Sequence, residues 1–159
     1  MNLFNFIQII NSYVKMHNIL FVCTANIFRS RFAEEVFNFL AIKEKIPVKA
    51  FSAGLKVGEY HIRKIYRPAL EQLEKLNIKP KRPNELSLHI DEVQLTNYDQ
   101  LICMDELEHK PMVLSNSKLK EFNFEYWDII DEPKVQSDVS LPICFSKVKE
   151  LVDCLKNKT

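Results

Sequence analysis

The sequence lacks several features that mark large classes of protein. Its net charge is only +1, which argues against a nucleic-acid-binding protein, because such proteins usually present a strongly basic face. No apolar run reaches about 18 residues, the length that a membrane-spanning helix needs, so no span is expected. The four cysteines form no CxxC pair, and no histidine lies at metal-ligand spacing: Cys23, Cys103, Cys144 and Cys154. Neither a zinc site nor a disulfide framework is therefore predicted.

The remaining composition is that of one ordinary domain. With 159 residues, 47% of them hydrophobic, the chain can bury a core of its own. Unpaired cysteines favour a reducing compartment, the cytoplasm, and we expect no metal and no cofactor. Glycine is scarce, since only Gly54 and Gly58 occur, and both lie in one loop. Their clustering predicts a tight backbone path there.

Residues 18–35 join an apolar strand, a loop and an amphipathic helix. The run at 19–22 is typical of a strand buried on both faces of a parallel sheet. Four apolar residues then recur at helical spacing from residue 31 onward: Phe32, Val36, Phe39 and Leu40. Cys23 directly follows the strand, and Arg29 directly precedes Ser30 at the start of the helix. The loop between them therefore ends at a helix N-terminus.

A loop in this position is suited to bind phosphate. The first N–H groups of a helix have no internal partner, and the helix dipole adds partial positive charge there. Arg29 can add a planar fork that matches two phosphate oxygens. The same field favours the thiolate of Cys23, the form that acts as a nucleophile. The predicted phosphate-binding residues are Thr24, Ala25, Asn26, Ile27, Phe28, Arg29 and Ser30.

The octapeptide CTANIFRS at residues 23–30 resembles the signature loop of the low-molecular-weight protein tyrosine phosphatases. That family shares its fold with thioredoxin-coupled arsenate reductases. Three later segments, in order, also resemble the family: FSAG at 51–54, YDQLICMD at 98–105 and WDIIDEP at 127–133. The resemblance spans roughly residues 18–155. It implies a phosphomonoester hydrolase, expected to be a protein tyrosine phosphatase, that acts through a cysteinyl-phosphate intermediate.

The resemblance also implies roles for individual residues. Cys23 would be the nucleophile, Arg29 the phosphate clamp and Asp131 the general acid, with Glu132 as the alternative acid. Asn26, Ser30 and Ser52 would support the loop. The partners would be a phosphotyrosine protein or a small phosphomonoester as substrate and inorganic phosphate as product.

Departures from the family pattern leave two alternatives open. Ala25 stands in place of a loop glycine, Phe28 in place of a second cysteine, and Arg31 in place of a proline. Lys134 and Val135 follow the acid segment where an aromatic pair is usual. One alternative is an arsenate reductase on the same fold, which would need two more thiols poised near Cys23. The other is a catalytically weak phosphate-binding module.

The order of strands and helices predicts an α/β fold. We expect a single three-layer domain at 16–159, a four-stranded parallel sheet flanked by helices, with the phosphate-binding loop after the first strand. The further strands are predicted at 48–51, 99–104 and 124–129, and the helices at 31–44, 68–76, 105–114 and 145–156. Residues 1–15 are predicted to be an N-terminal extension, for which three interpretations stay open. The extension packs on the domain, or it is not translated because Met16 is the true start, or it forms a helix that binds a partner or a membrane surface.

Four further predictions concern side chains and loops. The cysteines other than Cys23 are interpreted as packing residues and Trp127 as packed around the last strand. His61 and Tyr66 follow the glycine loop and could rim the pocket, but they are interpreted as exposed loop residues without a role. Residues 79–84 (KPKRPN) are interpreted as a solvated connector.

Overall fold

The computed structural model describes residues 3, 15–59 and 61–158. Its strands are β1 (His17–Cys23), β2 (Val48–Gly54), β3 (Gln100–Cys103) and β4 (Phe124–Tyr126). They form one parallel sheet in the order β2-β1-β3-β4. The helices are α2 (Arg29–Glu44), α3 (Arg67–Lys75), α4 (Glu106–Leu114) and α5 (Ser137–Lys156), with two 3₁₀ turns at Ile90–Glu92 and Leu95–Asn97.

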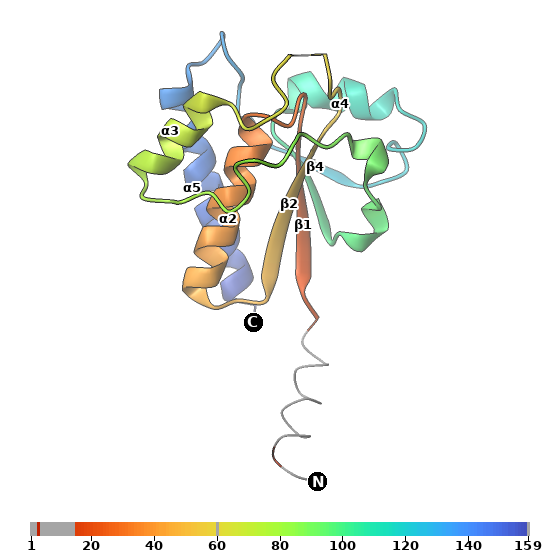
Figure 1. Cartoon of the computed structure of the whole chain (residues 1–159). Helices are drawn as coiled ribbons and strands as arrows, with labels where there is room; N and C mark the ends of the chain where they lie inside the picture. Colours follow the sequence, from red (N-terminus) through yellow and green to blue (C-terminus); the bar gives the residue numbers. More distant parts are fainter. Residues whose placement is uncertain (1–2, 4–14, 60, 159) are drawn as a thin grey trace.

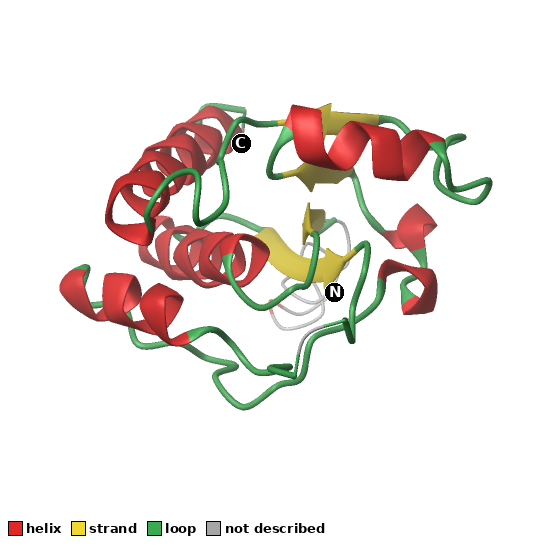
Figure 2. Cartoon of the chain, turned by 90° about the horizontal axis from the view of Figure 1, so that it is seen from above, coloured by secondary structure: helices red, strands yellow, loops and turns green. Residues whose placement is uncertain are grey.

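The sheet has helices on both faces, as Figures 1 and 2 show. Helices α2, α3 and α5 cover one face, whereas α4 and the two 3₁₀ turns lie on the other. Strand β1 is central, and its residues 19–22 are fully buried. Phe21 packs into the core under α2 and α5, and Leu20 packs into the core on the opposite face. The predicted three-layer α/β fold with a doubly buried first strand is thereby confirmed.

The carboxyl ends of the four parallel strands lie at one end of the sheet, the upper end in Figure 1. In open α/β folds ligands bind at this end. The loops that follow β1, β2 and β3 meet there, whereas the C-terminus lies at the opposite end. The fold thus brings segments distant in sequence to one edge beside Cys23.

Two predicted element boundaries are wrong. Helix α5 begins at Ser137, eight residues before the predicted start at 145. Pro142 lies inside it and normally disfavours a helix interior, but Leu141 and Cys144 are fully buried in the core on either side of it. Burial therefore outweighs the local preference of proline. Strand β4 ends at Tyr126, three residues earlier than predicted.

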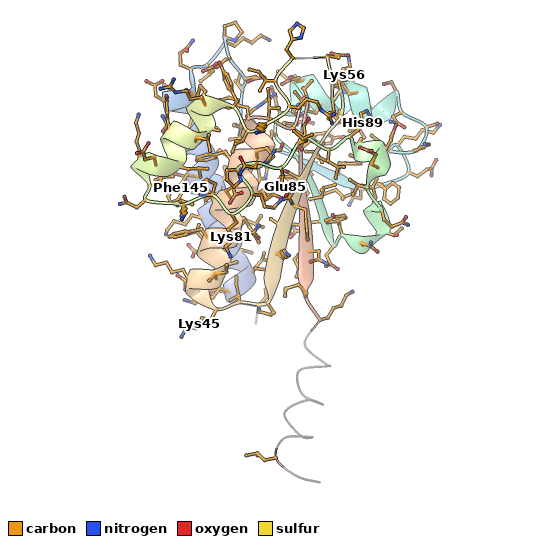
Figure 3. All side chains as sticks on the ribbon, viewed as in Figure 1. Lys45, Lys56, Lys81, Glu85, His89 and Phe145 are labelled. Carbon is orange, nitrogen blue, oxygen red and sulfur yellow. The ribbon has the colours of Figure 1, made fainter. Side chains whose placement is uncertain are left out.

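The segment 79–84 is a largely exposed connector, as predicted, but its backbone is also bound to helix α2. Its backbone N–H groups at Lys81 and Arg82 donate to the two carboxylate oxygens of Glu35, over 2.7 and 3.0 Å. Arg31, buried in α2, donates to the carbonyls of Arg82 and Glu85, over 2.6 and 3.0 Å. Figure 3 marks Lys81 and Glu85 where this segment crosses α2. The residue that replaces the family proline thus anchors the loop.

Two further predictions concern the cysteines and the N-terminal residues. Of the three cysteines interpreted as packing residues, Cys103 and Cys144 are buried, but Cys154 is exposed near the end of α5. The prediction was therefore wrong for Cys154. The proposed N-terminal extension, residues 1–15, lies outside the described residues except for Leu3 and Lys15, and it stays a prediction.

Candidate active site

The loop after β1 is held by its own side chains and by β2. Asn26 has a positive φ of 56°, a conformation that asparagine tolerates better than most residues. Its amide nitrogen donates to the Ser30 hydroxyl over 2.9 Å, and its amide oxygen accepts the Leu88 backbone N–H over 3.0 Å. Asn26 therefore ties the loop to helix α2 and to the segment at residue 88.

The end of β2 passes very close to the loop. A Cβ added at Gly54 would lie 2.7 Å from the Thr24 carbonyl oxygen and 3.0 Å from the Asn26 nitrogen. The next two residues donate backbone hydrogen bonds to the carbonyls of Cys23 and Thr24. This close approach explains why glycine stands at 54, and it fits the tight path expected there. Ser52, expected to support the loop, is buried in β2, but among the described residues no hydrogen bond joins its hydroxyl to the loop.

Cys23 and Ser30 are in direct contact at the bottom of the loop. The sulfur lies 2.9 Å from the Ser30 oxygen, and both residues are buried. Because the amide of Asn26 already donates to this hydroxyl, the Ser30 hydrogen is left to point at the sulfur. A sulfur that accepts a hydrogen bond is best satisfied as a thiolate. Helix α2 begins at Arg29 without a side-chain cap, so the unpaired N–H groups of its first turn add to the favourable field.

Arg29 is almost completely buried, with 1% of its side chain exposed, and both of its Nη groups have acidic partners. Its Nη1 donates to the carbonyl of Ile129 over 2.9 Å and pairs with Glu108 Oε2 at 2.8 Å. Its Nη2 lies 3.1 Å from Asp131 Oδ2. Its Nε has no partner among the described residues. Since guanidinium carries five N–H groups, one on Nε and one on Nη2 stay available, a fork that suits two phosphate oxygens.

The charges around Arg29 keep it ionised. Burial alone would lower the pKa of its guanidinium, but the hydrogen bond to Glu108 and the negative charges of Cys23, Asp131 and Glu108 together outweigh burial and raise the pKa. The site therefore holds a permanent, desolvated positive charge beside the sulfur of Cys23.

Sequence reasoning missed Glu108 and His109, both in the first turn of α4. Besides pairing with Arg29, Glu108 accepts a hydrogen bond from the Thr24 hydroxyl over 2.7 Å. The Nε2 of His109 lies 3.1 Å from the same hydroxyl, and its Nδ1 accepts the Asp105 N–H over 3.0 Å. One signal was available, because α4 directly follows the carboxyl end of β3, where α/β folds place binding residues.

Both carboxylates considered for the acid reach the cavity. Burial raises the pKa of Asp131, opposed by Arg29 and reinforced by Glu108. A carboxyl with a raised pKa is better able to carry a proton at neutral pH. Glu132 accepts the backbone N–H of Ser137 at the start of α5, over 3.3 Å. Asp128, by contrast, is exposed and pairs with Lys147. Of the two candidates, Asp131 is the one in contact with Arg29.

A cavity of about 400 Å³ opens above the loop. It is lined by loop residues, by the segment after β2 and by the acid segment: Cys23, Thr24, Ala25, Ile27, Phe28, Arg29, His61, Ile62, Tyr66, Asp131 and Glu132. His61 and Tyr66 thus rim the cavity, the alternative that the sequence left open; His61 is exposed as expected, whereas Tyr66 is partly buried. Tyr66 packs edge-on against Phe28, with ring centroids 5.6 Å apart. Trp127 packs instead on Phe21 in the core, with centroids 5.6 Å apart, as predicted.

Two kinds of site are absent from the part of the chain that the structure describes. No helix there is long and apolar enough to cross a membrane. No group of three or more histidine, cysteine or acidic side chains within those residues could hold a metal ion.

This arrangement is that of an α/β domain whose first loop joins a buried cysteine to a helix N-terminus beside a buried arginine. The profile of the family described as low molecular weight phosphotyrosine protein phosphatase matches residues 18–157. The chain belongs to this family, which confirms the resemblance found in the sequence. Among curated proteins, none matches the chain at a significant level.

Solved structures share the fold at low sequence identity. YfkJ from Bacillus subtilis superposes with a TM-score of 0.78 at 24% identity, over 92% of this chain and 99% of that one. An arsenate reductase from Archaeoglobus fulgidus gives 0.63 at 26% identity, over 85% and 98%. The arginine phosphatase YwlE, also from Bacillus subtilis, gives 0.68 at 23% identity, over 89% and 94%. The structures that share this fold thus include both a reductase and a phosphatase.

Proposed function

We propose that the protein hydrolyses phosphomonoesters through a cysteinyl-phosphate intermediate, with phosphotyrosine proteins as the expected substrates. The observation that carries the proposal is the contact of the Cys23 sulfur with Ser30 beneath a buried Arg29 that has two N–H donors to spare. Membership of a phosphatase family supports it.

The chemistry uses two in-line displacements. In the first, the Cys23 thiolate attacks phosphorus, the S–P bond forms, and the bond to the leaving oxygen breaks as Asp131 gives that oxygen its proton. Arg29 and the loop amides hold the equatorial oxygens, where charge is spread in the transition state. In the second, water attacks phosphorus, the S–P bond breaks, and Asp131 takes the proton of the water. Inorganic phosphate leaves, and the thiolate is restored.

The cavity wall supports an aromatic leaving group. Ile27, Phe28, Ile62 and Tyr66 give the cavity an apolar side on which a phenyl ring can pack, and Asp131 stands on the acid side. Such burial is favourable for a ring and gives little to a serine side chain. Phosphotyrosine is therefore preferred to phosphoserine in our proposal.

The arsenate reductase alternative needs a relay of thiols, and their positions argue against it. Burial raises the pKa of Cys144 to about 12 and that of Cys103 further still, so neither forms a thiolate readily. Cys154 is exposed, but it lies near the C-terminal end of α5, away from the loop (Figure 1). All four thiols are free, which supports our proposal that the protein works in the cytoplasm.

Hydrolysis of para-nitrophenyl phosphate in the presence of a metal chelator tests the proposal. We expect turnover by the wild-type protein and by Cys154→Ser, a control that changes an exposed thiol, and none by Cys23→Ser. A panel of phosphotyrosine, phosphoserine and phosphoarginine peptides then ranks the substrates. Absence of turnover on every phosphorylated compound, with tight binding of phosphate, would favour the weak binding module. Thioredoxin-dependent reduction of arsenate would favour the reductase.

A further inference from the structure

Helix α4 contacts the phosphate-binding loop through one carboxylate. Glu108 accepts the Thr24 hydroxyl with one oxygen, over 2.7 Å, and pairs with Arg29 Nη1 through the other, at 2.8 Å. We propose that Glu108 is a positioning residue that orients Arg29 and Thr24 toward a bound phosphoryl group. This inference rests on the proposed function, since it assigns a further residue to the same site.

The hydrogen bonds of Arg29 show what Glu108 does. The Nη1 group has two hydrogens, and both are used, one by the Ile129 carbonyl and one by Glu108. With that end of the guanidinium fixed, the plane of the group is fixed as well, and its spare donors are the one on Nε and one on Nη2. Loss of Glu108 would leave a buried N–H unpaired and the plane held by fewer contacts. The orientation of the phosphate fork thus depends on Glu108.

The hydrogen bonds around Thr24 run in one direction. A backbone N–H can only donate, so the Nδ1 of His109, which faces the N–H of Asp105, must accept. The hydrogen of the neutral ring is then on Nε2 and is donated to the Thr24 oxygen. The Thr24 hydrogen is donated in turn to Glu108. This series of hydrogen bonds fixes the orientation of the Glu108 carboxylate, whose second oxygen pairs with Arg29.

The carboxylate also moderates the charge of the site. Although burial alone would raise the pKa of Glu108, the hydrogen bond and the charge of Arg29 outweigh burial and lower it. Glu108 is therefore ionised beside Arg29 and opposes the approach of an anion. Removal of the Glu108 carboxylate should have two opposite effects. Phosphate is attracted more strongly, because a negative charge is lost, but the guanidinium of Arg29 that holds the phosphate is less well oriented.

Steady-state kinetics on Glu108→Ala and Glu108→Gln tests these two effects. We expect kcat for para-nitrophenyl phosphate to fall about 10- to 100-fold in Glu108→Ala, the loss that follows from one charged hydrogen bond, and less in Glu108→Gln, which can still accept from Thr24. The inhibition constant of inorganic phosphate should stay the same or decrease. Glu106→Ala is the matched control, because Glu106 lies on the same helix and pairs with Lys110 at the surface.

Two results would overturn the inference. One is a kcat for Glu108→Ala within about twofold of the Glu106→Ala value. The other is a phosphate affinity that falls in parallel with kcat, since this is what general damage to the fold would produce. Thermal unfolding of each variant identifies such damage directly.

A measurement independent of turnover separates this inference from the proposed function. The Arg29 Nε–H is buried, so its solvent exchange can be followed by ¹⁵N NMR in the full-length protein. We expect exchange at least about tenfold faster in Glu108→Ala and unchanged in Glu106→Ala, because local opening governs the exchange of buried groups. If the wild-type protein hydrolyses no phosphomonoester but Glu108→Ala still shows the faster exchange, only the proposed function fails. Equal exchange in all three proteins would refute the positioning role.

Discussion

Replacing His109 with asparagine should remove much of the loss of stability that the wild-type protein suffers in acid. His109 is fully buried, and its pKa is lowered to about 4, first by burial and then by the positive charge of Arg29, with Glu108 opposing. Protonation would also place a second N–H against that of Asp105. His109 therefore binds a proton less readily in the folded protein than in the unfolded chain.

The size and sign of the effect follow from these pKa values. A histidine whose pKa falls from 6.5 in the unfolded chain to about 4 in the fold contributes about 3 kcal/mol of pH-dependent stability. This contribution is fully present above about pH 6.5 and is lost progressively as the pH falls toward 4. Asparagine can still accept the Asp105 N–H but cannot be protonated, so the variant lacks this loss.

Urea denaturation at several pH values between 7 and 4 measures the difference. The free energy of unfolding of the wild-type protein should fall about 3 kcal/mol more than that of His109→Asn over this interval. Glu34 contributes in the opposite sense, because burial raises its pKa to about 7, so its contribution is lost as the pH rises. Since Glu34 is present in both proteins, its effect cancels in the comparison. Parallel curves would show that His109 is readily protonated in the fold, contrary to the hydrogen-bond directions inferred here.

Five other substitutions probe the site. Cys23→Ser should lower turnover by more than about 10³-fold without unfolding the protein, because a hydroxyl is far less ionised than a thiol; near-normal kinetics would refute the mechanism. Arg29→Lys should cost about 10²–10³-fold in kcat, since an ammonium has no planar fork; a small effect would show that Arg29 is not the clamp. In a leaving-group series, Asp131→Asn should lose about 10²–10⁴-fold for poor leaving groups and less for activated phenols, whereas Glu132→Gln barely changes the slope; the reverse pattern would assign the acid to Glu132. Gly54→Ala should destabilise the fold by about 1–3 kcal/mol, because the added Cβ would lie 2.7 Å from the Thr24 carbonyl oxygen; unchanged urea midpoints would contradict this.

The strand, loop and helix that carry Cys23 could be predicted because their signals are local. An apolar run of four residues, a cysteine and an arginine six positions later lie within one window of sequence, and the structure has the elements there. The side chains that Arg29 contacts could not be predicted in this way. Glu108 and the Ile129 carbonyl are 79 and 100 residues away in sequence and are brought together only by the order of the strands.

The remaining errors have a similar cause. The start of α5 was placed too late because its first turns are defined by what the helix packs against, which the sequence pattern does not show. The segment 79–84 is largely exposed as predicted, but the hydrogen bonds from its backbone N–H groups to Glu35 were not predicted. Backbone hydrogen bonds to a carboxylate distant in sequence cannot be predicted from amino-acid composition. Tertiary contacts thus decided each case.

The bond from Arg29 to the Ile129 carbonyl affects how fast the site can work. It ties the segment that bears Asp131 to the phosphate loop before any substrate arrives. Enzymes that carry their acid on a mobile lid must close it in every cycle, a motion of microseconds to milliseconds that solvent friction can slow. Here two hydrogen bonds hold this segment on the loop without substrate, so we expect turnover to need no closing step. Adding glycerol or sucrose to raise the viscosity should therefore leave kcat unchanged.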